Sequence, residues 1–254
     1  MPKAAGFHYF LYNEKDEDRL PAILIHGAGG SHLSWPPHMR RMKGQRIFAV
    51  DLPGHGKSDG AGRQSISGYA ADMLAFMDAL NLSSAAFVGH SMGAAIALAL
   101  TLQHPNRVRG LCLIGGGAKL RVSPAILDLT SRADTFASAV NLIVDNSFSE
   151  HAPPRLKELA AQRMLETPPP VLHGDFLASD GFNMMEDLPR IKTRTLILCG
   201  GEDKMTPPKY SEFLRDSIPG AALEIIPNAG HMLMLEKPDQ VTRSLEKFLD
   251  PLHR

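Results

Sequence analysis

The sequence has little of what marks secreted, membrane or nucleic-acid-binding proteins. It contains only two cysteines, Cys112 and Cys199, and each lies near the end of an apolar, strand-like run. We interpret both as buried free thiols, not as a disulfide or a metal pair. Acidic and basic residues balance at 27 each. Because the net charge is near zero, nothing in the composition favours nucleic acid or an anionic membrane as partner.

Long hydrophobic runs are missing as well. No segment approaches the roughly 18 uninterrupted apolar residues that span a bilayer. The start of the chain, MPKAAGFHYFLYNEKDEDR, lacks the basic flank and continuous apolar stretch of a signal peptide. We therefore expect a cytoplasmic protein that works on a small molecule. Its 254 residues, 44% of them apolar, suffice for one large domain with a small insertion.

What the sequence does contain is a regular alternation of strand-like and helix-like segments. Short apolar runs bounded by glycine or proline predict strands buried on both faces. Segments with helical spacing of their apolar residues lie between these runs. Such alternation predicts a doubly wound, mostly parallel α/β sheet. The predicted strands are 22–25, 47–50, 85–88, 108–114, 195–198 and 223–226, and the predicted helices include 67–80, 94–104 and 238–249.

The alternation breaks between about residues 119 and 190. This stretch has no good strand candidate, and prolines at 124, 153–154 and 168–170 separate its helix-like pieces. Loops of this length rarely lack secondary structure in compact domains, although an irregular surface excursion remains the alternative. We predict that residues 1–118 and 191–254 form the core and that residues 119–190 form a helical cap, or lid, over the sheet.

The sharpest motif is Gly89-His90-Ser91-Met92-Gly93, a G-x-S-x-G pattern between a predicted strand and an alanine-rich helix. Glycine at both ends lets the two backbones approach closely around a sharp turn, which lifts the serine above the edge of the sheet. The start of a helix also favours developing negative charge. We interpret Ser91 as a catalytic nucleophile, with an ordinary tight turn as the alternative.

A serine hydroxyl is a weak nucleophile unless a base removes its proton. His231 is the best-placed base, because it follows Gly230 in a loop between the last predicted strand and the last helix. The base in turn needs a carboxylate that fixes its tautomer and stabilises the imidazolium. Asp203 follows a buried strand and a glycine turn, and the neighbouring Glu202 is its rival. We predict that Ser91, Asp203 and His231 form a catalytic triad.

Acyl transfer also needs two N–H donors for the oxyanion. The residue after the nucleophile, Met92, supplies one of them. The loop HGAGGSHLSW follows an early strand and contains small residues that leave backbone N–H groups exposed. We predict Ala28 as the second donor, with Gly29 as the near alternative.

Together these motifs resemble the signature blocks of the α/β-hydrolase fold superfamily, most closely its small esterases and lactonases. The likeness runs from about Ile23 to the end of the chain and is weakest in the cap. It implies that Ser91 is the nucleophile, Asp203 the acid, His231 the base, and Ala28 with Met92 the oxyanion hole, with no cofactor. One departure is Ala94, where a second glycine is frequent. The blocks are HGAGGSHLSW, DLPGHGKSDG, GHSMGA, GGEDKMTPP and NAGHMLMLEKPD.

Two other kinds of site are not supported. Gly56-Lys57-Ser58 suggests a nucleotide-binding P-loop, but the glycine that this motif needs five residues earlier is Asp51. We expect Asp51 and Ser58 to brace the loop. Three histidines spaced by six residues match no zinc pattern and have no cysteine or acidic residue between them, so we predict no metal site; they are His26, His32 and His38.

Apolar side chains in the insertion suit either an acyl pocket or ordinary core packing, since methionine commonly fills gaps. The candidates for the pocket are Phe136, Phe148, Phe182, Met184 and Met185.

The expected function is a carboxylesterase that cleaves small or medium acyl esters through an acyl-enzyme. A lactonase, a thioesterase or a C–C bond hydrolase uses the same triad, although C–C hydrolases often carry proline in the oxyanion loop, where this chain has Gly-Ala-Gly-Gly. Dehalogenases and epoxide hydrolases of this fold place aspartate where this chain has Ser91. A small-molecule receptor with little turnover is the alternative outside enzymes, because a fold alone does not imply function. The oligomeric state has no sequence signal.

Overall fold

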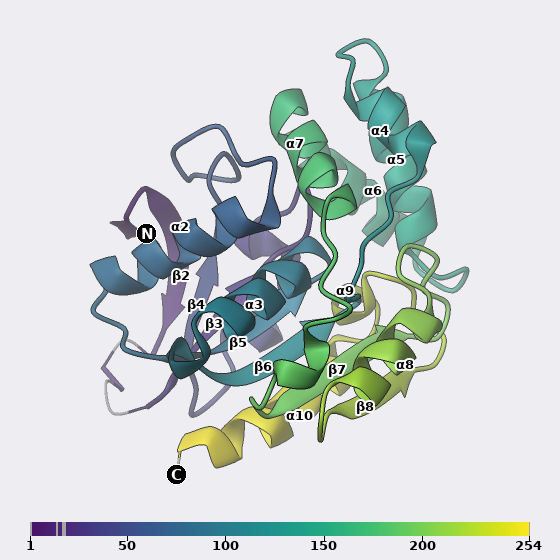
Figure 1. Cartoon of the computed structure of the whole chain (residues 1–254). Helices are drawn as coiled ribbons and strands as arrows, with labels where there is room; N and C mark the ends of the chain where they lie inside the picture. Colours follow the sequence, from purple (N-terminus) through teal and green to yellow (C-terminus); the bar gives the residue numbers. More distant parts are fainter. Residues whose placement is uncertain (1, 14, 17–18, 254) are drawn as a thin grey trace.

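A single sheet organises the protein. The structure, a computed structural model, describes residues 2–13, 15–16 and 19–253. Within these residues, eight strands form one sheet in the order β1-β2-β4-β3-β5-β6-β7-β8 (Figure 1). Neighbours from β4 to β8 pair in parallel, which confirms the predicted doubly wound, mostly parallel α/β fold. The parallel strands are β3 (Pro21–Ile25), β4 (Arg46–Val50), β5 (Ala85–His90), β6 (Val108–Ile114), β7 (Thr195–Gly200) and β8 (Ala222–Ile226).

The N-terminal edge of the sheet was not predicted. Strands β1 (Lys3–Ala4) and β2 (Phe7–Tyr12) form an antiparallel hairpin, and β2 also pairs antiparallel with β4. The sequence of β2, FHYFLY, has neither a run of β-branched residues nor a clear alternation of apolar and polar side chains. Its first half is buried and its second half is partly exposed, which leaves no periodic signal to detect.

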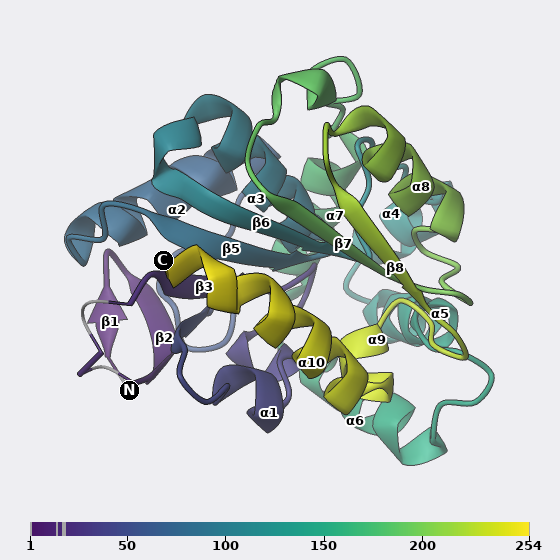
Figure 2. The same ribbon diagram turned by 90° about the horizontal axis from the view of Figure 1, so that it is seen from below.

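Helices cover both faces of the sheet (Figure 2). On one face α2 (Ile66–Ala79), α3 (Met92–Gln103) and α8 (Pro208–Ser217) contribute to one buried apolar cluster. On the other face α1 (Pro37–Arg40), α9 (Leu233–Glu236) and α10 (Pro238–Leu249) contribute to a second cluster. Short 3-10 turns complete the core: η1 (His32–Ser34), η2 (Pro105–Arg107), η3 (Leu188–Arg190) and η4 (Asp250–His253).

The central helix α3 explains how the sequence brings strand and helix close together. Its residues Met92 to Thr101 are all buried, because the helix is apolar on every side and lies between α2 and the sheet. Gly93 lies so close to β3 that a Cβ atom there would collide with the carbonyl oxygens of Ile25 and His26. The helix ends before Pro105, as the sequence predicts.

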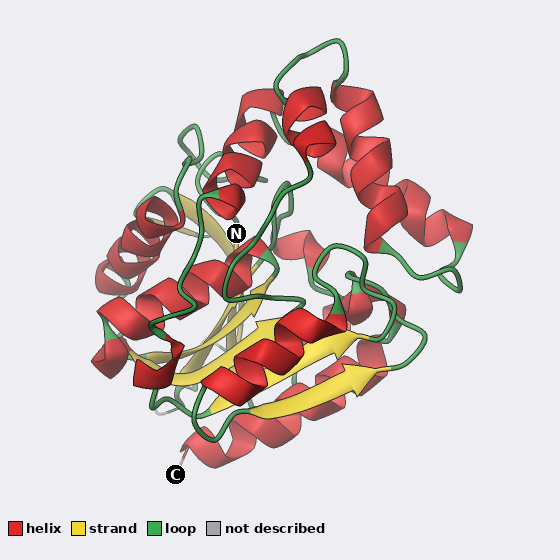
Figure 3. Cartoon of the chain, turned by 45° about the vertical axis from the view of Figure 1, so that its right-hand side comes forward, coloured by secondary structure: helices red, strands yellow, loops and turns green. Residues whose placement is uncertain are grey.

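Four helices between β6 and β7 lie over one end of the sheet (Figures 1 and 3). They have their own buried apolar cluster, which is separate from the two clusters that flank the sheet. A single antiparallel bridge between Lys119 and Asn183 joins the two ends of this segment. The helices are α4 (Pro124–Thr130), α5 (Phe136–Ser147), α6 (Pro154–Leu165) and α7 (Pro169–Asp180). We call them the cap.

None of the helices in the described part of the chain is both long and apolar enough to cross a lipid bilayer.

Candidate active site

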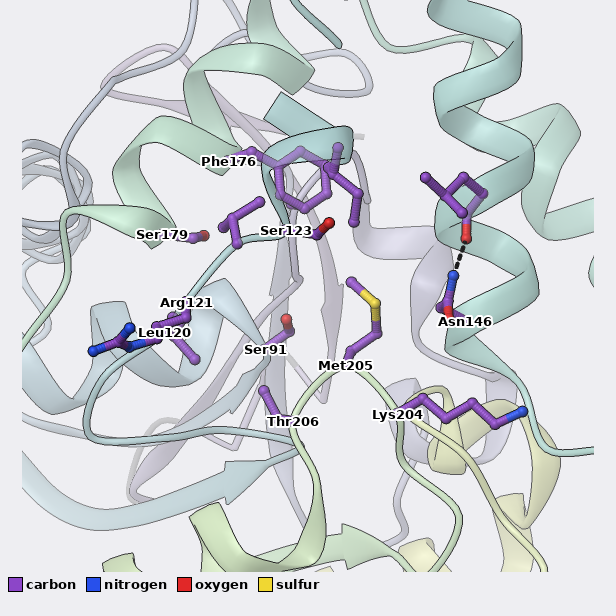
Figure 4. A pocket seen from close by; sticks show the side chains of 14 residues that line it. Ser91, Leu120, Arg121, Ser123, Asn146, Phe176, Ser179, Lys204, Met205 and Thr206 are labelled. Carbon is purple, nitrogen blue, oxygen red and sulfur yellow. Dashed lines mark hydrogen bonds between the residues drawn. The ribbon is translucent and has the colours of Figure 1, made fainter. Parts of the chain in front are cut away.

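The turn after β5 presents Ser91 in a strained backbone conformation. Its φ of 53° and ψ of −117° are unusual for a residue with a side chain. The side chain makes no capping hydrogen bond to α3, although Ser91 is the residue that precedes the helix. The hydroxyl is therefore free to face the space under the cap (Figure 4). This is the geometry expected of a G-x-S-x-G nucleophile turn.

His231 and Asp203 meet at the end of the sheet. The loop after β8 carries His231, and its Nδ1 atom lies 2.8 Å from Oδ2 of Asp203, which follows β7. Both side chains are buried. Ser91 and His231 line the same cavity, so the three residues predicted from sequence are brought together.

The Asp203 carboxylate is held by four donors. Its Oδ1 accepts the backbone N–H groups of Met205 and Thr206, at 2.9 and 2.8 Å. Its Oδ2 accepts from His231 and from the hydroxyl of Thr206, at 2.8 and 2.9 Å. Burial by itself raises the pKa of a carboxyl group, but the His231 imidazole and these hydrogen bonds outweigh burial and lower the pKa of Asp203. The charged form that a triad requires is thereby stabilised.

Glu202 points elsewhere. Its carboxylate accepts a hydrogen bond from the backbone N–H of Glu150 at 3.3 Å and lies 3.6 Å from His151, which is exposed. Of the two acidic residues that the sequence offered, only Asp203 contacts His231 in the structure.

His90 contacts the backbone of His231. Its Nε2 lies 3.0 Å from the main-chain oxygen of His231, and the two rings are 4.8 Å apart between centroids. Burial, together with the neighbouring His231 ring, lowers the pKa of His90 to about 3. His90 is therefore neutral near pH 7 and donates its single N–H to the backbone of the loop that carries His231.

In the loop after β3, two of three successive N–H groups have hydrogen-bond partners. Gly29 N–H donates to Oδ2 of Asp175 at 2.9 Å, and Gly30 N–H donates to the carbonyl of Gly27 at 3.1 Å. Among the described residues, neither Ala28 N–H nor Met92 N–H has a hydrogen-bond partner. Both residues predicted as oxyanion donors thus have free N–H groups, whereas the N–H of the alternative, Gly29, is already bound to Asp175.

Two cavities meet at Ser91. The larger one, of about 450 Å³, extends under α5 and α6 and is lined mainly by aliphatic and aromatic side chains. The smaller one, of about 230 Å³, lies between α4, α7 and the loop after β7. Hydroxyl and amide groups line part of it, from Ser123, Ser179 and Asn146. Figure 4 shows that the charged ends of its two cationic residues, Arg121 and Lys204, point away from Ser91.

Comparison with known proteins identifies the family. A sequence model described as "Alpha/beta hydrolase family" matches residues 22–244. The chain belongs to the alpha/beta hydrolase family.

Individual relatives of this alpha/beta hydrolase are similar over nearly the whole length. It is 30% identical to a 2-hydroxymuconate semialdehyde hydrolase of Pseudomonas putida, over 98% of this chain and 94% of the relative. It is 26% identical to 3-oxoadipate enol-lactonase 1 of Acinetobacter baylyi, over 91% of this chain and 90% of the relative. A solved structure of a thermophilic esterase matches it with a TM-score of 0.84 at 33% identity, covering 97% of this chain and 94% of the other. These similarities support a hydrolase.

Most of the apolar residues suggested for the acyl pocket lie elsewhere in the alpha/beta hydrolase. Phe148 lines the larger cavity, but Phe182 and Met184 pack against the main core and Met185 is exposed. Phe136 is buried inside the cap cluster. The segment 181–187 returns to the core beside Ala118, so Phe182 and Met184 face the core and not the cavity.

A buried polar cluster braces the loop next to the site, as expected for Asp51 and Ser58. The Asp51 carboxylate bonds to Nδ1 of His8 at 2.6 Å and to Nδ1 of His32 at 2.8 Å, while the Ser58 hydroxyl donates to the Asp51 carbonyl at 2.6 Å. One ligand atom from each of His8, His32 and Asp51 lies within 4.8 Å of the others, which is close enough to hold a metal ion. The carboxylate already accepts from both rings, whereas Nε2 of His32 is buried without a hydrogen-bond partner among the described residues.

Proposed function

We propose that this alpha/beta hydrolase cleaves small or medium carboxylic esters through an acyl-enzyme formed on Ser91. The observation that carries the proposal is the position of Ser91. Its strained backbone holds the hydroxyl where two cavities meet, and the buried His231–Asp203 pair borders the larger of them. A side chain held this way serves nucleophilic catalysis better than it serves packing.

The reaction has four steps. His231 takes the proton of Ser91 as the serine oxygen attacks the carbonyl carbon of the ester. The imidazolium, held by Asp203, then protonates the leaving alcohol as the tetrahedral intermediate collapses to the acyl-enzyme. Water enters and loses its proton to His231 while its oxygen attacks the acyl carbon. Collapse of the second intermediate releases the acid and restores Ser91.

Ala28 and Met92 N–H groups stabilise the oxyanion in both tetrahedral intermediates. Each donor contributes about 3–4 kcal/mol, by analogy with other oxyanion holes. Their freedom from other hydrogen bonds supports this role, since a donor that is already paired would first have to break a bond. Gly29 N–H already donates to Asp175, so we do not assign it as an oxyanion donor.

The two cavities suggest how an ester binds. The larger, mainly apolar cavity suits the acyl chain, and the smaller cavity suits the alcohol. Because Arg121 and Lys204 direct their charges away from Ser91, the smaller cavity favours an uncharged alcohol over one that carries an acidic group.

A lactone or a C–C bond is the second candidate substrate, and the relatives favour it. The enol-lactonase and the 2-hydroxymuconate semialdehyde hydrolase both align with more than nine-tenths of this chain. The oxyanion loop reads Gly-Ala-Gly-Gly here, without the proline that we associate with C–C hydrolases. The triad is common to all three reactions, so the choice rests on substrate tests.

The deciding experiment compares the wild type with Ser91→Ala on p-nitrophenyl esters of graded acyl length. We expect turnover of the wild type and its loss, by about 10⁴-fold or more, in a variant with an unchanged circular dichroism spectrum. Equal turnover in the two proteins would rule out the acyl-enzyme. No turnover in either would move the assignment to a C–C hydrolase or to a receptor, which binds its ligand with or without the serine hydroxyl.

A further inference from the structure

Both backbone groups of Gly29, in the oxyanion loop, are hydrogen-bonded to the cap. Gly29 N–H donates to Oδ2 of Asp175 in α7 at 2.9 Å, and its carbonyl accepts from the hydroxyl of Thr167 at 3.1 Å. Gly29 has a φ of +62°, and a Cβ atom at this position would press against Leu172 and Met164 of the cap. The loop and the cap are therefore fitted to each other at a single residue.

The two peptide planes on either side of Ala28 are held by different parts of the chain. The plane before it contains the Gly27 carbonyl, which lies 2.8 Å from Nδ1 of His26 and 3.1 Å from the N–H of Gly30. The plane after it contains Gly29 N–H, whose acceptor is Asp175. The N–H of Ala28 lies in the first of these planes, which the core holds, and the cap holds the second plane of the same turn.

His26 is in the protonation state that holds the Gly27 carbonyl. Its Nε2 accepts the backbone N–H of Leu52 at 3.0 Å, which leaves Nδ1 as the protonated nitrogen that donates to Gly27. Burial, and after it the charge of His55, lower the pKa of His26 to about 4. The ring is neutral at pH 7, in the one tautomer that serves both contacts.

Asp175 is a fully buried carboxylate that the proposed chemistry does not itself use. Besides Gly29, it accepts from Nε2 of His55 at 2.7 Å and from the hydroxyl of Tyr69 at 2.5 Å. All three donors come from the core, and the acceptor comes from the cap. A buried carboxylate is costly unless several donors satisfy it, and these three donors hold the group in one position.

We infer that Asp175 is a positioning residue of the oxyanion hole: its Oδ2 holds Gly29 N–H, and with it the turn from which Ala28 N–H reaches the oxyanion. The inference rests on the proposed function, in which Ala28 N–H binds the oxyanion. The cap therefore has a part in the chemical step as well as in enclosing the substrate. A loss of this contact raises the barrier to the tetrahedral intermediate while leaving the two cavities lined as before.

Three variants of the full chain test the inference. Asp175→Ala removes the acceptor. Asp175→Asn removes the charge but keeps an amide oxygen that can still accept from Gly29, so it is the conservative rescue variant. Tyr69→Phe removes a donor from the other oxygen of the same carboxylate and is the matched control for general damage to the network, since Tyr69 binds Oδ1 and Gly29 binds Oδ2. Each variant is assayed at least 15 °C below its own midpoint of thermal unfolding.

The measurements are kcat and KM on p-nitrophenyl esters and the affinity for a trifluoromethyl ketone, which forms a tetrahedral adduct with a serine oxygen. We expect Asp175→Ala to lower kcat by about 10²-fold with KM changed less than threefold, because one oxyanion donor is worth about that much. Its affinity for the ketone falls by a similar factor. Asp175→Asn stays within about fivefold of the wild type, and Tyr69→Phe within about threefold.

Other patterns would overturn the inference. Equal losses of kcat in Asp175→Ala and Tyr69→Phe would mean that the network only stabilises the fold. A loss confined to KM would mean that Asp175 shapes the cavity. If Asp175→Ala does not fold, Thr167→Val replaces it, and the inference then requires a lower kcat at unchanged KM. Ser91→Ala separates the proposed function from the positioning role. If activity is lost in Ser91→Ala but is complete in Asp175→Ala, the positioning role is refuted and the proposed function is not.

Discussion

His90 Nε2 donates a hydrogen bond to the main-chain oxygen of His231 at 3.0 Å. The residue before the proposed nucleophile thus holds the backbone of the proposed base, across 141 positions of sequence. Replacing it by phenylalanine keeps a ring but removes the donor and leaves a buried carbonyl unpaired. We expect His90→Phe to lower kcat about tenfold and KM little, in steady-state assays of ester hydrolysis. His90→Gln retains an N–H donor and should recover part of the loss; identical rates in all three proteins would contradict this role.

The acidic pair at the end of β7 allows a matched comparison. Asp203→Asn keeps the shape of the side chain but changes the tautomer of His231, so we expect kcat to fall by about 10⁴-fold, by analogy with other triads. Glu202→Gln should retain activity within about twofold, because Glu202 faces the cap and lies near the exposed His151. The measurement is kcat on the best ester of the graded series. A large loss in Glu202→Gln with little loss in Asp203→Asn would exchange their roles.

Stability should fall on the alkaline side because of His55. Burial lowers the pKa of this imidazole, but the Asp175 carboxylate, 2.7 Å away, outweighs burial and raises it above 6.5. A group whose pKa is raised by folding contributes stability that is complete below its unfolded pKa and is lost as the pH rises through its folded pKa. We expect the free energy of unfolding of the wild type to exceed that of His55→Gln at pH 6 by more than at pH 9, in urea titrations.

Neighbouring groups do not obscure that measurement. The pKa of His26 lies near 4, so His26 stays neutral over this range, and burial beside Asp175 raises the pKa of Tyr69 above its usual value. A difference between wild type and His55→Gln that is constant from pH 6 to pH 9 would show that His55 is not protonated in the folded protein.

The preference for acyl chain length should depend on Ala160, which lines the larger cavity from α6. Ala160→Phe fills part of this space, so we expect kcat/KM for the longest accepted esters to fall by about 10–100-fold while the shortest esters react as before. Leu165→Phe is the control, because Leu165 lies on the same helix but is 46% exposed. A uniform loss over all chain lengths would place the acyl chain in the smaller cavity.

Sequence reasoning found the elements whose signals are local. The apolar runs that form β3 to β7 stand out because these parallel strands are buried on both faces, and the Ser91 turn is recognisable because its glycines must flank it. The amphipathic helix α8, which begins after Pro207, and the strand β2 were missed. In β2 the apolar residues do not alternate with polar ones, and in α8 the apolar residues are few.

What the sequence could not supply are contacts between distant segments. Asp175 bonds to Gly29 across 146 positions, and nothing near either residue indicates the pairing. The choice between Ala28 and Gly29 depends on that bond. The choice between Asp203 and Glu202 depends on the directions of two adjacent side chains. Apolar residues such as Phe182 are equally suited to line a cavity or to pack a core, so composition alone could not separate the two.

The bridge between Lys119 and Asn183 has a consequence for how such a chain can diversify. Because the segment leaves and rejoins the core at one point, a different set of helices could be grafted there without altering any strand. Asp175 restricts that freedom. A chimera whose foreign helices bring no hydrogen-bond acceptor opposite Gly29 would have a new substrate cavity but a misplaced oxyanion loop.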